Sequence, residues 1–146
     1  MQEGSSFVDS KVELPDGTKV YLSDYIGNGH YVLVNIWASW CGACIAELPE
    51  IRNAGEKYAS KNLKLLSISI DRDRKDWEKA LKRLGLPWTQ VLADYSFVNS
   101  YGINKIPVLM LISPDGVILK RNFVKEKCRV KICMYDKYRL KICMES

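Results

Sequence analysis

A Cys-x-x-Cys motif stands at the junction of a predicted strand and a predicted helix, and this segment constrains the rest of the chain most. The apolar run at residues 31–36 predicts a buried strand of a parallel or mixed sheet. Cys41 and Cys44 follow it, and residues 45–51 predict the first turns of a helix. A helix start presents unpaired N–H groups and the positive end of the helix dipole. A thiolate is stabilised there, so the motif favours thiol chemistry at neutral pH.

The spacing of the two cysteines favours a redox pair over a metal site. It lets the second sulfur fold back by one helical turn onto the first, so that a disulfide can form and break within one small loop. A structural disulfide or half of a zinc site is the alternative. Zinc requires two further ligands, and the other cysteines of the chain match no common zinc spacing, while His30 is the only histidine. We therefore expect no metal and no other cofactor.

The residues around the motif resemble the active site of the thioredoxin superfamily. The fuller pattern Val-Asn-Ile-Trp-Ala-Ser-Trp-Cys-x-x-Cys-x-x-Glu-x-Pro, which begins at Val34, is similar to the extracytoplasmic TlpA/ResA-like thiol–disulfide oxidoreductases. The likeness extends from about Val12 to Phe123. It implies an α/β fold, namely a thioredoxin-like three-layer α/β/α sandwich with a mixed central sheet and an N-terminal β-hairpin. We expect this domain at residues 7–123 and a disordered leader at residues 1–6.

The resemblance also implies the roles of the thiols and of one acid. Cys41 is the expected nucleophile, which forms a mixed disulfide with the substrate, and Cys44 is the expected resolving thiol. Glu47 lies three residues after Cys44 on the same helix face, where a partly buried carboxylate has a raised pKa and can move protons. ResA-like proteins carry a glutamate at this position. The alternative is an ordinary surface glutamate, which the helix dipole favours.

Three further residues are expected to contact the substrate. The resemblance implies that Pro107 is cis and lies against the disulfide, where its backbone can pair with an extended substrate chain. Ile106 is expected to shape the site beside it. Trp40 is expected to form an apolar rim around the nucleophile, whereas Trp37 is expected to pack in the core.

The family likeness implies an enzyme that reduces protein disulfides. Its expected partners are disulfide-bearing or dithiol proteins and an upstream electron donor. A thiol peroxidase is a second hypothesis, because peroxiredoxins share the broader fold. Their pattern Pro-x-x-x-Thr-x-x-Cys has Val34 and Ala38 at the proline and threonine positions here, so the oxyanion-binding threonine is missing. A non-enzymatic module that binds a partner through its tail is the third hypothesis.

Composition limits the compartment and the partners. A chain of 146 residues is one domain with a sizeable core. No apolar run approaches the roughly 20 residues of a membrane span, and the first six residues predict no signal peptide. The likeness favours a periplasmic or other extracytoplasmic location, with a membrane anchor only in a longer form, and a cytoplasmic location stays open. The net charge of +5 accompanies no nucleic-acid-binding motif, so no nucleic-acid partner is expected.

The basic, cysteine-rich tail at residues 124–146 departs from thioredoxins, which end in an amphipathic helix. It repeats Arg-(Val/Leu)-Lys-Ile-Cys-Met at a spacing of ten residues, and its alternating apolar residues predict strands. A hairpin that turns at residues 135–137 would place Ile132 opposite Leu140 and Lys131 opposite Lys141. The alternatives are pairing with a second molecule, which would give a dimer, or a tail of aberrant origin.

Overall fold

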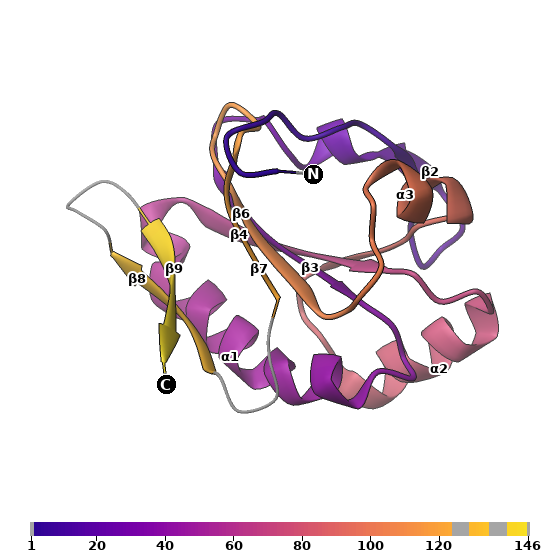
Figure 1. The fold of residues 1–146 in the computed structure, drawn as a ribbon. Helices are drawn as coiled ribbons and strands as arrows, with labels where there is room; N and C mark the ends of the chain where they lie inside the picture. Colours follow the sequence, from indigo (N-terminus) through magenta and orange to yellow (C-terminus); the bar gives the residue numbers. More distant parts are fainter. Residues whose placement is uncertain (1, 124–128, 135–139, 146) are drawn as a thin grey trace.

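The computed structural model describes residues 2–123, 129–134 and 140–145 (Figure 1). The strands are β1 (Lys11–Glu13), β2 (Lys19–Tyr21), β3 (Tyr31–Trp37), β4 (Leu63–Ser69), β5 (Thr89–Leu92), β6 (Val108–Ile112), β7 (Ile118–Phe123), β8 (Arg129–Met134) and β9 (Leu140–Glu145). The α-helices are α1 (Gly42–Tyr58), α2 (Arg74–Leu84) and α3 (Tyr95–Ser100), and two 3₁₀ turns are η1 (Leu22–Asp24) and η2 (Ala59–Lys61).

A mixed sheet forms the centre of the domain. Its seven strands lie in the order β2-β1-β5-β4-β3-β6-β7. β3, β4 and β5 are parallel, whereas β6 pairs with β3 and β7 pairs with β6 in the antiparallel sense. The short hairpin β1–β2 extends the sheet through an antiparallel contact with β5. The mixed sheet and the N-terminal hairpin are as the sequence predicted.

Helices cover both faces of this sheet, because the buried strands are apolar on both faces. Leu33 of β3 packs with α1, and Trp37 packs with α2. Val34 and Ile36 point to the opposite face, where they join a cluster with residues of α3 and η1. Figure 1 shows α1 and α2 below the sheet and α3 with the N-terminal segment above it. The predicted three-layer α/β/α arrangement is confirmed.

Local sequence signals set the ends of the helices. The Asp73 side chain accepts a 2.9 Å hydrogen bond from the backbone N–H of Lys75 and caps α2. Gly85 ends this helix in the left-handed conformation, with φ of 58°, which glycine adopts without steric cost. Asp94 caps α3 in the same way through the N–H of Phe97.

The N-terminal segment differs from the expected leader. The N–H of Gly4 donates to the carbonyl of Ile118 at 2.7 Å, and the N–H of Ile118 donates to Ser5 at 2.9 Å. The N–H of Phe7 donates to Gly116 at 2.9 Å. The described part of residues 1–6 is therefore tied to the domain by backbone hydrogen bonds, which a reading of local composition could not anticipate.

The tail contains two strands, but the expected register is wrong. β8 and β9 pair in the antiparallel sense, with Ile132 opposite Ile142 and Lys131 opposite Cys143. The two lysines that the predicted register opposed are therefore not partners. β8 lies beside α1 and β9 beside β7 (Figure 1). The predicted turn at residues 135–137 lies outside the described residues.

Candidate active site

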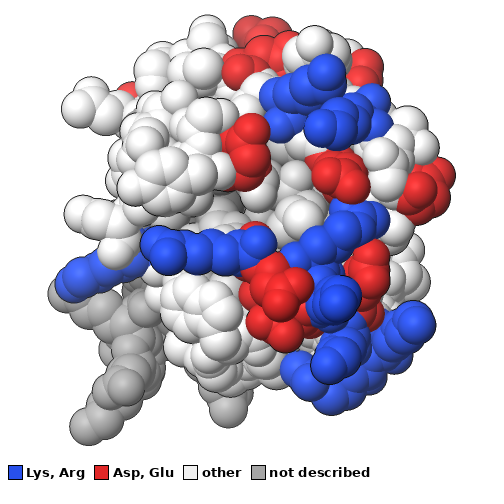
Figure 2. Space-filling view, turned by 90° about the vertical axis from the view of Figure 1, so that its right-hand side faces the viewer, with Lys and Arg blue, Asp and Glu red and all other residues white. Residues whose placement is uncertain are grey.

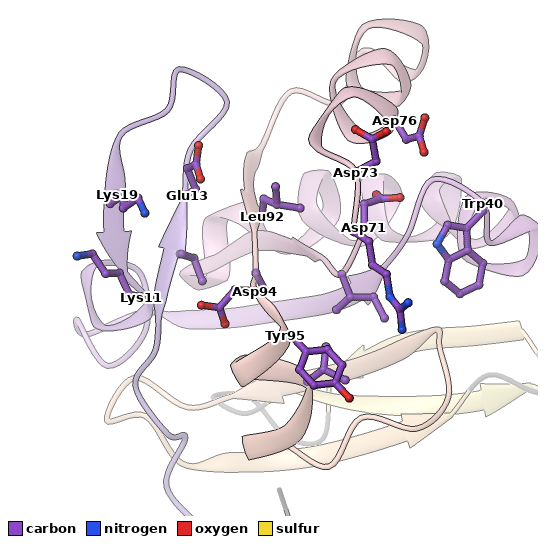
Figure 3. A pocket seen from close by; sticks show the side chains of 15 residues that line it. Lys11, Glu13, Lys19, Trp40, Asp71, Asp73, Asp76, Leu92, Asp94 and Tyr95 are labelled. Atoms are coloured by element: carbon purple, nitrogen blue, oxygen red, sulfur yellow. The ribbon is translucent and has the colours of Figure 1, made fainter.

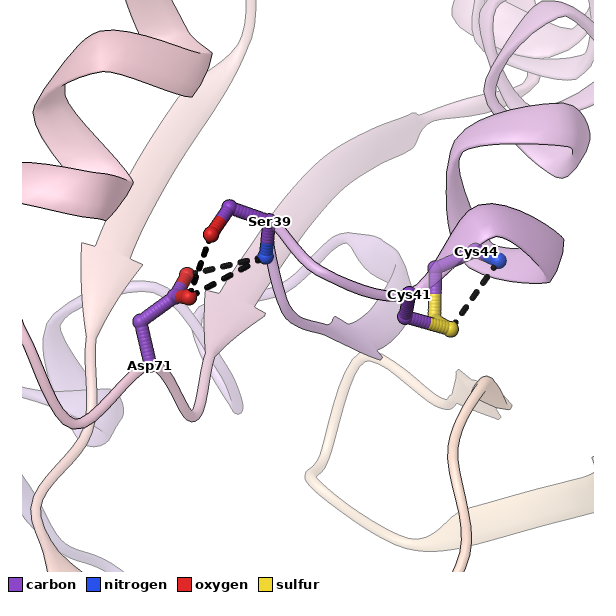
Figure 4. The surroundings of a disulfide bond; sticks show 4 residues. All are labelled: Ser39, Cys41, Cys44 and Asp71. Atoms are coloured by element: carbon purple, nitrogen blue, oxygen red, sulfur yellow. Dashed lines mark hydrogen bonds between the residues drawn. A yellow bond between two sulfur atoms is a disulfide. The ribbon is translucent and has the colours of Figure 1, made fainter.

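The two cysteines of the motif are joined in a disulfide at the start of α1 (Figure 4). Their Cα atoms lie 5.3 Å apart. Cys41 is the N-cap residue, in extended backbone conformation, and its Sγ accepts a 3.2 Å hydrogen bond from the backbone N–H of Cys44. Cys41 is 8% exposed and Cys44 only 1%, so the first sulfur is the more accessible. The expected meeting of the sulfurs at a helix start is present.

Apolar side chains surround this disulfide. Both cysteines belong to a buried cluster with Trp37, Trp77 and Ala80, against which Ile106 packs. Trp37 is fully buried, as the sequence predicted for a core residue. The cluster joins the start of α1 to α2, so the second helix supports the redox pair from the side of the sheet that both helices cover.

Pro107, which directly precedes the neighbouring strand β6, lies at the same end of the sheet. The Ile106–Pro107 peptide bond is cis, and Pro107 is buried. Val108, the next residue, is opposite Ile36 near the end of β3, from which the chain continues to the cysteines. The cis bond that the family likeness implied is therefore present. Trp40, which precedes Cys41, is by contrast 69% exposed, and its role as an apolar rim stays a prediction.

Glu47 is a buried acid on the redox helix. It is 7% exposed, and its Oε1 atom has no hydrogen-bond partner among the described residues. Burial disfavours the charged form and raises the pKa of the Glu47 carboxyl from 4.5 to about 7. The alternative of an ordinary surface glutamate is therefore wrong. A carboxyl of this kind can accept or release a proton near neutral pH.

Asp71, a residue that no sequence motif indicated, supports the loop that leads into the cysteine motif. This carboxylate is 5% exposed and follows β4. It accepts hydrogen bonds from the backbone N–H of Ser39 at 3.1 and 3.2 Å, and from the hydroxyls of Ser39 and Ser69 at 2.6 Å each (Figure 4). Because β3 and β4 are parallel neighbours, a signal existed: their carboxyl ends bring Asp71 beside the segment before Cys41.

The part of the chain that the structure describes contains neither a metal-binding cluster nor a membrane-spanning helix. Within the described ranges, no group of three or more His, Cys, Asp or Glu side chains is placed to hold a metal ion. No helix in this part of the chain combines the length and apolar character needed to cross a membrane.

The fold and the redox pair together define a thioredoxin-like protein of the thiol–disulfide oxidoreductase class. The chain belongs to the Redoxin family, whose model matches residues 2–135. It is 26% identical over 121 residues to the thiol-disulfide oxidoreductase ResA of Bacillus subtilis, across 82% of this chain and 66% of that protein. It is 29% identical over 118 residues to ResA of Geobacillus thermodenitrificans, across 80% of this chain and 67% of the relative. The chain therefore spans about two thirds of the length of these relatives.

Solved structures agree with this assignment. The thioredoxin domain of a thiol-disulfide oxidoreductase from Bacteroides vulgatus superposes with a TM-score of 0.76 at 28% identity, over 84% of this chain and 89% of that one. A thiol-disulfide oxidoreductase from Bacteroides fragilis gives a TM-score of 0.72 at 32% identity, over 83% and 92% of the two chains. The TlpA/ResA-like resemblance that the sequence motifs indicated is confirmed.

Proposed function

We propose that this chain is a thiol–disulfide oxidoreductase that reduces disulfides of protein substrates outside the cytoplasm. The observation that carries the proposal is the Cys41–Cys44 pair at a helix start, at the same end of the sheet as the cis peptide bond before Pro107. The relatives named thiol-disulfide oxidoreductases support the activity. The likeness to the extracytoplasmic TlpA/ResA-like branch supports the direction of electron flow and the compartment.

The reaction proceeds by two thiol–disulfide exchanges. In the reduced protein, the Cys41 thiolate attacks one sulfur of the substrate disulfide, which forms a mixed disulfide and releases the other substrate sulfur as a thiolate that takes up a proton. Cys44 then loses its proton and attacks the Cys41 sulfur, which releases the second substrate thiol and forms the intramolecular disulfide. Two electrons pass to the substrate, and an upstream dithiol donor must return them.

Glu47 serves this scheme as the proton acceptor for Cys44. The two residues lie one helical turn apart, and Cys44 is too buried to exchange its proton freely with water. A carboxyl with a pKa of about 7 can take that proton at neutral pH and pass it on. Trp40, Ile106 and Pro107 form the substrate-binding surface: the exposed indole supplies apolar contact, and the backbone next to the cis bond offers strand-like hydrogen bonds.

The surroundings of the motif favour this reaction over peroxide reduction. A peroxidase of the peroxiredoxin pattern requires a hydroxyl three residues before its nucleophile. Ala38 occupies that position, and both it and Val34 are fully buried apolar side chains. The site therefore lacks the hydroxyl that would orient a peroxide.

Single cysteine replacements test the proposal. Reduced protein is mixed with a peptide disulfide, and the released thiol and the intact protein mass are followed. Cys41→Ser is expected to abolish release, whereas Cys44→Ser is expected to accumulate a mixed disulfide detectable by mass. Cys143→Ser, which removes a thiol outside the motif, is the matched control and keeps the wild-type rate. Full activity of the Cys41→Ser protein contradicts the proposal.

An equilibrium titration tests the direction of electron flow. A reductant that works outside the cytoplasm needs a reduction potential more negative than about −200 mV, the poise of an oxidising compartment. Titrating the Cys41–Cys44 pair against glutathione measures that potential. A value well above this limit assigns the chain to disulfide formation instead.

A further inference from the structure

A cleft begins at Trp40 beside the redox pair and extends toward the N-terminal hairpin (Figure 3). Its volume is about 1160 Å³. Three parts of the chain that lie far apart in sequence form its walls: β1 with β2, the segment from the end of β5 into α3, and residues 70–76 after β4. Trp40, at one end of the cleft, directly precedes Cys41, so this end of the cleft lies next to the redox pair in the chain.

Two large aromatic side chains are exposed along this cleft. Trp40 is 69% exposed and Tyr95 is 67% exposed, and both line it. Figure 3 shows Tyr95 between Trp40 and the hairpin lysines. Exposed aromatic side chains of this size beside a concavity are typical of surfaces that contact a partner, since they supply apolar area at a small cost in conformational entropy. The cleft therefore has apolar contact points as well as charges.

The balance of acidic and basic side chains differs between the two ends of the cleft. Asp71, Asp73 and Asp76 line the part near Trp40, together with Arg72, so carboxylates exceed cations three to one there. Lys11 and Lys19 of the hairpin lie at the far end together with the exposed carboxylate of Asp94 (Figure 3), so the excess of negative charge is at the Trp40 end. The space-filling view in Figure 2 shows acidic and basic side chains interleaved on the right-hand part of that face, so the order of charges along the cleft, and not the net charge of the face, distinguishes its two ends.

Two of the three carboxylates near Trp40 are exposed and can contact a ligand. Asp71 is buried by its bonds to Ser39 and Ser69 and acts on a ligand only through its field. Asp73 is exposed and uses one oxygen to cap α2. Asp76 is exposed in the first turn of that helix. Glu13, which also lines the cleft, is paired with Arg74 and contributes little net charge.

We propose that this cleft holds the polypeptide that flanks the reactive cysteine of the substrate, and that it selects segments with cationic side chains next to that cysteine. The inference rests on the proposed function, since it assigns a substrate class to the same site. A lysine or arginine close to the substrate disulfide lies against the acidic part of the cleft, with its aliphatic stem on the Trp40 ring. An acidic side chain at that position is repelled.

Peptide disulfides of matched composition test this preference. Short peptides with one cysteine carry 2-nitro-5-thiobenzoate in a mixed disulfide, with lysines or glutamates on one side of the cysteine, in both orientations. An uncharged peptide is the reference. We expect the reduced protein to cleave the lysine peptide of one orientation with a kcat/KM about tenfold above that of its glutamate counterpart. The difference should disappear at about 1 M salt, where the screening length is only about 3 Å.

Substitutions of Asp76 test whether the preference for lysine peptides arises in the cleft. Asp76→Lys is expected to reduce the ratio of lysine-peptide to uncharged-peptide rates several-fold, and Asp76→Asn to reduce it less. Using this ratio removes any effect on the disulfide chemistry itself. Glu56→Gln, which changes an exposed acid of α1 outside the cleft, is the control and retains the wild-type ratio.

The outcomes separate the two proposals. Equal rates for lysine and glutamate peptides in both orientations overturn the cleft assignment, as does a preference that Asp76→Lys leaves intact. In either case cleavage of the uncharged peptide still supports the redox function. Failure to cleave even the uncharged peptide contradicts the proposed function itself.

Discussion

The pH dependence of stability gives a direct measure of how deeply Glu47 is buried. Burial raises the pKa of this carboxyl from 4.5 to about 7 in the folded protein. Below pH 4.5 the group is protonated in both the folded and the unfolded chain. Between these two values the folded chain holds a proton that the unfolded chain has lost, so the free energy of unfolding falls as the pH rises. Above about pH 7 the full cost of the buried charge is present.

The size of the effect follows from the two pKa values. A difference of one unit corresponds to about 1.4 kcal/mol, so the shift of the Glu47 pKa from 4.5 to about 7 destabilises the folded protein by about 3 kcal/mol at alkaline pH. Glu47→Gln keeps the shape of the side chain and removes the titration. Any cost of burying the amide is independent of pH and drops out of the comparison. The stability of the Gln variant relative to wild type should therefore rise by about 3 kcal/mol between pH 4.5 and 7.5.

Urea unfolding of the oxidised proteins at a series of pH values measures this difference. Tryptophan fluorescence and circular dichroism should report the same transition if unfolding is two-state. Glu56→Gln, at an exposed position of the same helix, is the control and should differ from wild type by a constant amount. A Glu47→Gln difference that stays constant over this range, or that falls with pH, would refute the argument from burial.

Two further substitutions test contacts that position the site. Asp71→Asn places an amide donor against the N–H and hydroxyl donors of Ser39 and Ser69, so we expect a loss of about 2–3 kcal/mol in urea unfolding; an unchanged midpoint contradicts a role for these bonds. Gly55→Ala should destabilise by about 1–3 kcal/mol although alanine favours helices, because its Cβ would lie 2.5 Å from Leu65 Cδ1. A stabilised Ala variant in the same assay would show that α1 can move away from β4.

Local patterns in the sequence were sufficient for the elements that carry the chemistry. The apolar run before Cys41, the Asp73 cap and the Gly85 stop act within a few residues of themselves, so their effects follow from backbone geometry and short-range hydrogen bonds. The family motif added the cis bond before Pro107, which the structure contains. These features place a redox pair at a helix start before any tertiary contact is known.

The hairpin of the tail shows that local sequence patterns do not determine the register of two paired strands. Alternation of apolar and polar residues assigns side chains to the two faces of a strand but does not decide which residues are opposite each other. The predicted pairing of Ile132 with Leu140 and the observed pairing with Ile142 differ by two residues and give the same faces. The choice between them depends on the turn and on packing against the rest of the chain.

By itself, the sequence determined the strand, the cysteine pair and the helix, because each depends on neighbouring residues. Only the tertiary structure decided that Asp71 bonds to Ser39, a residue 32 positions away, and that Glu47 is buried without a partner for its Oε1 atom among the described residues. It also decided that separate segments enclose a cleft beside Trp40. The physical reason is that hydrogen bonds across the sheet and the loss of solvent around a carboxyl arise from which elements pack together, which local periodicity does not encode.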